Sequence, residues 1–290
     1  MGLLWLVTIV WAFSFSLIGV YLSGQVDDYV SVFIRTGLAS LLFLPMMLRR
    51  LPSLRLAGQL MAIGGLQIGL MYLFLFHAFG HLTVPEVLLF TILTPLYITL
   101  MDDLLDWRIR LPWQWWLATG LAVLGAAVIR WEGITTDGWL GFLLVQAANI
   151  CFAAGQVMYR RLKLGQATDQ VRDFGFFFLG GLAVATLAVV TLGDWKQGPT
   201  GPLQWGVLIW LGLGASGLGY LAWNSGARRV NTAQLAVMNN MLIPAGLLVN
   251  VAFWSTPAEW ARLIGGGALL GVALIWAHRG RANNRAKPLR

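Results

Sequence analysis

The sequence has almost none of the residues from which catalytic and metal centres are usually built. It holds one cysteine, Cys151, and three histidines at separate places. Neither a disulfide framework within the chain nor a cysteine–histidine metal cluster is therefore expected. The HExxH and GxSxG patterns of metalloproteases and serine hydrolases are missing as well. These gaps argue against an intramembrane enzyme, and no metal or cofactor is predicted.

Charge is equally scarce. Only 11% of the 290 residues are charged while 58% are hydrophobic, a balance that does not fit a soluble domain of this size. The chain divides instead into ten apolar stretches, each close to the roughly 20 residues that an α-helix needs to cross a bilayer. They cover residues 3–23, 29–48, 56–76, 83–101, 112–129, 139–159, 174–193, 203–223, 232–254 and 260–277. The predicted fold is an all-α membrane protein with ten transmembrane helices.

The net charge of +8 would suit a nucleic-acid-binding protein, but its distribution follows the membrane. When the N-terminus is placed in the cytoplasm, sixteen of the 20 Lys and Arg residues fall on the cytoplasmic side, and only Arg130, Lys196 and Arg262 fall outside. This asymmetry is the positive-inside rule, and it predicts that both termini are cytoplasmic. The lipid bilayer is an expected partner and nucleic acid is not. No obligate protein partner is indicated.

The chain also repeats itself. The stretch 71–82 (MYLFLFHAFGHL) matches 219–230 (GYLAWNSGARRV), and the residues that follow pair Pro95 with Pro244. Each half would hold five helices, an odd number, so the second half enters the membrane from the opposite side. Such inverted repeats place a substrate site between the halves, near the middle of the membrane. The expected domains are a first five-helix repeat over 1–131, a second over 137–279 and a basic cytoplasmic tail over 280–290.

These features resemble a known family. The WAFSFS stretch in the first span, the proline in the fourth span of each half and the glycine-rich closing helices are similar to the EamA family of the drug/metabolite transporter superfamily. More narrowly, LLFTILTPLYITL, ASGLGYLAWNSGA and MNNMLIPAGLLVN resemble the biotin transporters of bacterial inner membranes. The resemblance covers almost the whole chain. It implies uptake of a small carboxylate-bearing metabolite, biotin in particular, by alternating access around a central cavity.

One basic and one acidic residue are expected inside membrane spans. Arg35 lies about two turns from the outer end of the second span, and Glu86 about one turn from the outer end of the fourth. Charges at this depth usually face a partner or an interior cavity. One interpretation is a structural ion pair between the two. The other is that Arg35 grips a substrate carboxylate, with Glu86 as a competing or proton-linked partner.

Amides and hydroxyls at membrane depth form a second set of candidates. Asn239 and Asn240 shortly precede Pro244, and adjacent helical residues point about 100° apart, so at most one should point straight into a cavity. An amide both donates and accepts, which suits a ureido ring, and an interhelical hydrogen bond is the alternative. Thr94 stands in the equivalent stretch just before Pro95.

A polar stripe marks the sixth span, where Gln146, Asn149 and Gln156 fall within about 60–80° of one another on a helix. Because lipid would solvate these amides poorly, the stripe is expected to face the interior of the bundle. Asn149 and Gln156 are therefore candidate substrate-binding residues.

Aromatic residues supply the remaining candidates. Tyr72 and Tyr220 occupy matching places in the two halves, and Trp223 follows one turn later. Trp11 and Ser14 lie three residues apart on one face of the first span. Plain packing would explain such aromatic residues, but aromatic walls with a few polar groups are also what a small-ligand cavity needs.

Two further expectations concern the ends and breaks of helices. Pro95 and Pro244 each remove a backbone donor within a span, so a kink is expected at both. The acidic residues Asp102, Asp103 and Asp106 at the inner end of the fourth span are expected to be solvated and offset by Arg108 and Arg110.

The residues leave the direction of transport open. A secondary transporter that imports a small carboxylate satisfies the pattern. An exporter of aromatic or other amino acids, or of amphiphilic metabolites, fits an aromatic cavity equally well. Sensitivity of cells to an inhibitory substrate analogue indicates import, whereas tolerance indicates export.

Overall fold

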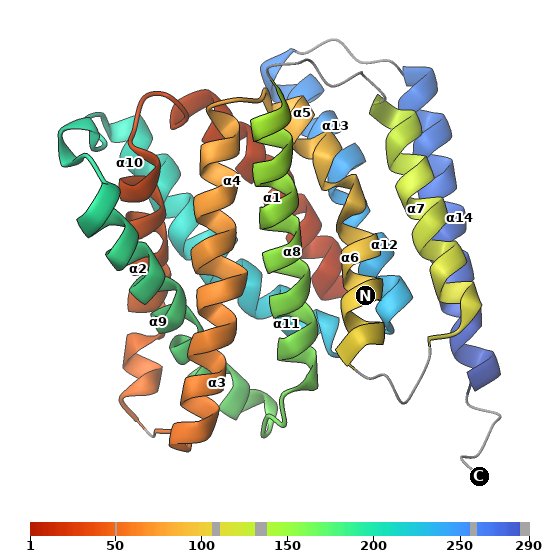
Figure 1. The fold of residues 1–290 in the computed structure, drawn as a ribbon, viewed down its shortest axis with the longest axis horizontal. Coiled ribbons are helices and arrows are strands. Elements are labelled where there is room, and N and C mark those ends of the chain that lie inside the picture. The colour runs from red at the N-terminus through yellow and green to blue at the C-terminus, as the bar shows by residue number, and fades with distance from the viewer. Residues whose placement is uncertain (50, 106–110, 131–137, 256–259, 285–290) are drawn as a thin grey trace.

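The computed structural model describes residues 1–49, 51–105, 111–130, 138–255 and 260–284, and every regular element in these ranges is a helix (Figure 1). Nine of the helical stretches in this described part are long and apolar enough to cross a bilayer. A tenth, Trp113–Val128, is apolar but shorter. All ten stretches expected from hydropathy are therefore helical.

The α-helices follow one another with few long connections in the described part of the chain. They are α1 (Gly2–Tyr21), α2 (Asp28–Met47), α3 (Leu54–Gly64), α4 (Met71–Phe79), α5 (Val84–Phe90), α6 (Thr94–Leu105), α7 (Trp113–Arg130), α8 (Trp139–Arg161), α9 (Ala167–Leu192), α10 (Pro202–Ile209), α11 (Gly219–Ala227), α12 (Thr232–Asn240), α13 (Leu242–Trp254) and α14 (Trp260–Asn284).

Polar residues begin several of these helices. Asp27 accepts a hydrogen bond from the backbone N–H of Val30 (2.9 Å) at the start of α2, and Asn231 accepts one from Gln234 (2.8 Å) at the start of α12. A side-chain oxygen at this position satisfies an N–H group that has no partner within the helix. The caps therefore fix where these spans begin.

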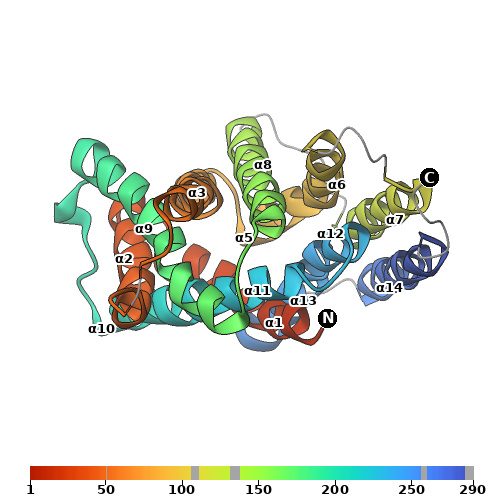
Figure 2. The same ribbon diagram turned by 90° about the horizontal axis from the view of Figure 1, so that it is seen from below.

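Helices from the two halves of the chain are interleaved in the bundle. α2 lies beside α9 at one end of the molecule, and α7 lies beside α14 at the other, in both views (Figures 1 and 2). Between these pairs, α4 packs on α8, and α1 packs on α11 and α13. Each long helix of the first half thus packs mainly on helices of the second half, so any interior space is lined by both halves.

Glycine allows the closest of these approaches. A methyl group on Gly64 of α3 would collide with the carbonyl oxygen of Phe177, and one on Gly180 of α9 would collide with that of Met61. Without a hydrophobic effect between helices in lipid, small residues that let backbones touch are a main source of helix association. These two glycines therefore let α3 and α9 pack in backbone contact.

The third and eighth expected spans differ from plain α-helices. Each contains a π-helical segment, Gly65–Leu70 between α3 and α4, and Trp210–Leu218 between α10 and α11. A π-helical turn carries one more residue than an α-helical turn and is frequent at functional sites. The two segments end shortly before Tyr72 and Tyr220, so they set the direction of both tyrosines.

The expected kinks at the two prolines are confirmed. A 3-10 turn at Thr91–Leu93 separates α5 from α6 just before Pro95, and α12 ends at Asn240, four residues before Pro244. A proline lacks an N–H group and its ring collides with the carbonyl four residues earlier, which interrupts the helix there. The carbonyls freed at each break need other hydrogen-bond donors, and several of the amides described below supply them.

Candidate functional site

A cavity lies where the middle parts of both halves meet. Residues of α1, α2, α4, α6, α8, α11, α12 and α13 line it, together with Thr91 of the 3-10 turn. The space open to the centres of water molecules is about 90 Å³. One such centre needs only roughly 10–15 Å³, so the cavity holds several waters or a small ligand.

Aromatic rings form one wall of this cavity. The ring of Trp11 lies 4.8 Å from that of Trp223, 4.9 Å from that of Tyr220 and 5.8 Å from that of Phe152, measured between centroids. The indole N–H of Trp11 donates to the carbonyl of Ala215 (2.8 Å), a residue of the second π-helical segment. The polar end of the indole is thus satisfied, and its faces are left for apolar contact.

Among the described residues, Arg35 is the one cation on the cavity wall. Its side chain is 2% exposed, and its Nε donates to the hydroxyl of Ser216 (2.6 Å). The same hydroxyl lies 2.8 Å from the hydroxyl of Tyr72, whose ring centroid is 4.0 Å from the guanidinium carbon. Nη1 of Arg35 has no hydrogen-bond partner, and no carboxylate of the described residues forms an ion pair with this guanidinium. A buried cation without an anion is energetically costly, so the site favours a negatively charged ligand.

Of the two interpretations of Arg35 and Glu86, the structural ion pair is wrong. Glu86 lies in the first turn of α5, where its Oε2 accepts from both the backbone N–H and the hydroxyl of Thr83 (2.7 Å each). The carboxylate satisfies a free donor at the helix start and is partly exposed, away from the cavity wall. Glu86 is therefore a helix-capping residue rather than a partner of Arg35.

Two amides of α8 donate hydrogen bonds to a backbone carbonyl at the helix break of the first half. Asn149 and Gln146 both donate to the carbonyl of Phe90 (3.0 Å each), which lies at the end of α5 where the helix is interrupted. The expectation that this stripe faces the bundle interior is confirmed, since both side chains are at least 92% buried. Asn149 also lines the cavity, as does Thr94.

Of the two adjacent asparagines, Asn239 lines the cavity and Asn240 does not. Asn240 is fully buried and donates to the carbonyls of Ile92 (3.1 Å) and Ala122 (3.0 Å). Ile92 belongs to the 3-10 turn before Pro95, so an amide of the second half satisfies a carbonyl in the helix break of the first. The expectation that only one of the pair reaches the cavity is confirmed, and the helix break explains where the other is used.

Gln156 lies just outside the cavity, behind the ring of Trp223. Its Oε1 accepts from the indole N–H of Trp223 (2.7 Å), and its side chain is fully buried but absent from the cavity wall. Trp223 faces the cavity itself, so Gln156 reaches a ligand there only through the ring that it holds.

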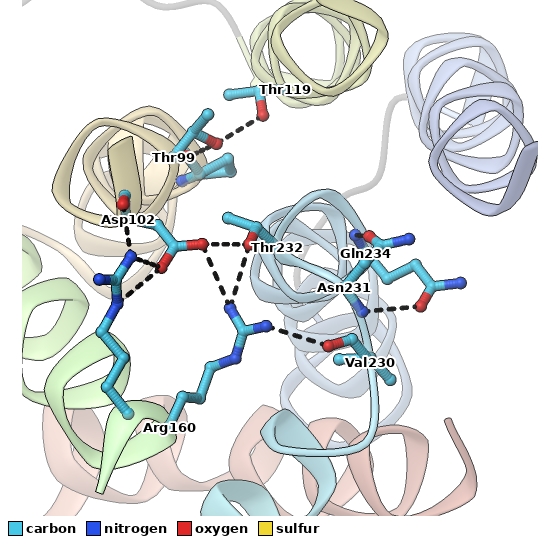
Figure 3. A network of polar contacts seen from close by, with 10 residues as sticks. Thr99, Asp102, Thr119, Arg160, Val230, Asn231, Thr232 and Gln234 are labelled. Carbon is cyan, nitrogen blue, oxygen red and sulfur yellow. Dashed lines mark hydrogen bonds and ion pairs between the residues drawn. The ribbon is translucent and has the colours of Figure 1, made fainter. Parts of the chain in front are cut away.

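A polar network joins the ends of α6 and α8 to the start of α12 (Figure 3). Oδ1 of Asp102 lies 2.8 Å from Nη2 of Arg161, and its Oδ2 lies 3.7 Å from Nη1 of Arg160 and accepts from the hydroxyl of Thr232. Arg160 also donates to Thr232 (3.2 Å) and to the carbonyl of Val230 (3.1 Å). The expectation that Asp102 is solvated is wrong, because its side chain is only 12% exposed and pairs with two arginines of the neighbouring helix α8. Asp106, Arg108 and Arg110 lie outside the described residues.

The cavity and the network are successive layers along the same helices. On α8, Asn149 lines the cavity, Gln156 follows about 10 Å further along and Arg160 another 6 Å beyond, at 1.5 Å per residue. On α12 the order is Asn239 and then Thr232. Material leaving the cavity toward this end of the bundle would pass the layer of Gln156 and then the network.

Comparisons with known proteins agree with this architecture. The model of the EamA-like transporter family matches residues 1–131. The chain is 48% identical over 279 residues to the biotin transporter of Escherichia coli K12, covering 96% of this chain and 93% of that protein. It is 51% identical over 284 residues to the probable biotin transporter of Pseudomonas aeruginosa, covering 97% and 98%.

The chain belongs to the EamA-like transporter family. A solved crystal structure of 20% sequence identity superposes with a TM-score of 0.73 over 95% of each chain, which shows the same fold. The nine spanning helices of the described part and the family together make this EamA transporter a multi-pass protein of the bacterial inner membrane, and not an enzyme.

The cavity of this EamA transporter contains nine of the twelve residues that the sequence singled out, namely Trp11, Ser14, Arg35, Tyr72, Thr94, Asn149, Tyr220, Trp223 and Asn239. The other three, Glu86, Gln156 and Asn240, lie outside it for the reasons given above. Ser216, which joins Arg35 to Tyr72, was not among the predicted residues. Its place one turn before Tyr220, in the otherwise apolar segment Trp210–Leu218, was the available signal.

Proposed function

We propose that this chain is a secondary transporter that imports biotin across the bacterial inner membrane by alternating access. The curated relatives that share about half of its residues carry the name biotin transporter, at nearly full length. The observation that carries the proposal for the site is Arg35, a buried guanidinium on the wall of a central cavity that pairs with no carboxylate of the described residues.

Biotin has a carboxylate at one end of an apolar chain and a fused ring system at the other. The guanidinium of Arg35 supplies charge-assisted hydrogen bonds for the carboxylate, through the free Nη1 in particular. Trp11, Tyr220 and Trp223 supply ring faces for the apolar part. Asn239 and Asn149 add amide groups on the cavity wall, which suit the ureido ring.

The two halves act in this proposal as inverted five-helix repeats, over 1–131 and 137–279, followed by the basic tail over 280–290. Three pairs of features support it. A π-helical segment precedes both Tyr72 and Tyr220, a helix break precedes both prolines, and α7 pairs with α14 as the closing helix of each half. The excess of Lys and Arg on one side supports cytoplasmic termini.

With this orientation, the Asp102 network lies on the cytoplasmic side of the cavity. It joins α6 of the first repeat to α8 and α12 of the second. A state with these contacts made is closed toward the cytoplasm, and import requires them to separate as one repeat rocks against the other. The helix breaks before Pro95 and Pro244 give both repeats a place at which to bend.

Uptake of labelled biotin tests the proposal directly. Cells that lack their own biotin transporter and express this chain should accumulate the label, while cells that carry the empty vector should not. Normal insertion of the protein without accumulation rejects biotin import. The direction follows from a toxic biotin analogue, since import makes cells sensitive to it and export makes them tolerant.

A further inference from the structure

Three buried amides lie between the cavity and the Asp102 network. Gln67 of the first π-helical segment, Gln156 of α8 and Asn224 of α11 are each fully buried. Each also keeps one polar atom without a hydrogen-bond partner among the described residues: Oε1 of Gln67, Nε2 of Gln156 and Nδ2 of Asn224. Buried polar atoms are almost always paired, so three orphans in one layer need an explanation.

The amides come from neighbouring positions on helices that touch. Nε2 of Gln67 donates to Oδ1 of Asn224 (3.3 Å). Gln67 also packs against Gly155 of α8, where any larger side chain would collide with it. Gln156 is the next residue on α8, and it accepts from Trp223, the residue before Asn224. Two adjacent residues of α8 therefore face two adjacent residues of α11, with Gln67 packed between the helices.

The donors and acceptors left over in this layer are fixed by chemistry. An indole N–H only donates, so the atom of Gln156 facing Trp223 is an oxygen and its free atom is an N–H donor. In the Gln67–Asn224 pair, exchanging both amide orientations still leaves one free oxygen and one free N–H group. The layer as a whole offers two unused donor groups and one unused acceptor.

We infer that Gln67, Gln156 and Asn224 form a second binding site, on the cytoplasmic side of Trp223, for the cyclic urea of the substrate. The inference rests on the proposed function, since it concerns the same passage of a ureido compound. The urea carbonyl accepts from the two free N–H groups, and one ring N–H donates to the free oxygen. A cyclic urea presents these complementary groups on one small ring.

Trp223 links the two sites. Its ring lines the cavity, and its N–H holds Gln156 in the layer below. A displacement of this indole opens the cavity floor and at the same time releases the oxygen of Gln156. The ring of the substrate then exchanges the amides of the cavity for those of this layer, before the Asp102 network opens beyond it.

A variant that replaces a free hydrogen-bond donor of this layer by an acceptor tests the inference. The ionised carboxylate of Gln156→Glu keeps the acceptor for Trp223 and replaces the free donor by an acceptor of similar size. The probes are biotin and 2-iminobiotin. In 2-iminobiotin a cyclic guanidine replaces the cyclic urea, and in its protonated form it offers only N–H donors and no acceptor oxygen. Transport of both is measured with purified protein in proteoliposomes, together with the binding of biotin to the detergent-solubilised protein and its thermal stability.

In Gln156→Glu the maximal rate for biotin should fall about tenfold, the effect of one buried hydrogen-bonding group left unpaired. The rate for 2-iminobiotin should fall much less, so the ratio of the two rates shifts at least about fivefold toward 2-iminobiotin. The Kd for biotin in the cavity stays within about twofold of the wild-type value. Asn224→Asp tests the same prediction from α11 in case the first variant does not fold.

The matched control is Asn250→Asp, the same chemical change at a buried amide of α13 that already donates to Gly246 (3.0 Å). Its rate ratio should equal that of the wild type. Equal losses for both compounds in Gln156→Glu, or an unchanged biotin rate, overturn the second site and leave the proposed function standing. If the wild-type protein transports neither compound, the proposed function itself is rejected and the second site with it.

Discussion

The guanidinium carbon of Arg35 lies 4.0 Å from the centroid of the Tyr72 ring, and both side chains meet the hydroxyl of Ser216. Arg35 comes from α2 and Tyr72 from α4 in the first half, whereas Ser216 comes from the second π-helical segment. The ring face and the hydroxyl hold the cation in place without neutralising it. The remaining charge is available to an anionic substrate.

Arg35→Lys separates charge from geometry. A lysine keeps the positive charge but loses the planar group that bonds Ser216 and covers Tyr72, so biotin uptake should fall by at least about tenfold. Arg35→Gln should reduce uptake to the background. The measurement is the initial rate of uptake, normalised to the amount of protein in the membrane. Wild-type rates in Arg35→Gln would show that the guanidinium does not contact substrate.

Ser216→Ala removes the hydroxyl that joins Arg35 to Tyr72. Because each of these bonds contributes about 1 kcal/mol, the Kd for biotin should rise roughly three- to tenfold. Tyr72→Phe should have a similar effect, and the double variant should be little worse than either single one, since the two changes break one network. Binding to the purified protein measures all three. Fully additive losses would mean that the two residues act independently.

Asn239 and Asn240 should behave differently when each is replaced by alanine. Asn240→Ala leaves the carbonyls of Ile92 and Ala122 without their donor, and membrane hydrogen bonds average about 0.6 kcal/mol, so two lower the free energy of unfolding by about 1 kcal/mol. The melting temperature should drop by about 2–4 °C with the Kd for biotin unchanged.

Asn239→Ala should show the reverse, a Kd raised severalfold with a melting temperature close to the wild-type value. Thermal unfolding and binding on the same purified samples distinguish the two. A larger effect of Asn240→Ala on binding than on stability would mean that this amide, and not Asn239, faces the substrate.

A double-mutant cycle tests the Asp102 network. Asp102→Asn and Arg161→Gln should each lower the melting temperature, and the double variant should be barely less stable than Asp102→Asn alone. The coupling energy should be about 1 kcal/mol, the upper range for a pair that is only partly exposed. Coupling near zero would show that the pair does not hold the end of the bundle together.

The positions of the helices were predictable from the sequence because hydrophobic length and proline chemistry act locally. The ten spans follow from the thickness of the bilayer, and the breaks follow from the clash that Pro95 and Pro244 create with earlier carbonyls. The role of Glu86 was also visible, since Thr83 and Glu86 stand at the spacing of a capping box at the start of a helix.

The hydrogen-bond partners of individual polar side chains were not predictable, because they depend on helix rotation and on contacts between distant segments. The two π-helical segments add residues to their turns and so rotate Tyr72 and Tyr220 in a way that no α-helical periodicity gives. Asp102 meets Arg161 across 59 positions of sequence, and Asn240 meets Ile92 across 148. Only the packed bundle decides which amide binds a backbone carbonyl and which faces the cavity.

The carboxylate of the substrate gives the most direct test of the central site. The measurement is the Kd of the purified protein for biotin and for biotin methyl ester, in the wild type and in Arg35→Gln. The wild type should bind biotin at least about tenfold more tightly than the ester, the value of a charge-assisted hydrogen bond, and in Arg35→Gln this preference should vanish. Equal affinities in the wild type, or a preference that survives the loss of the guanidinium, would contradict the account.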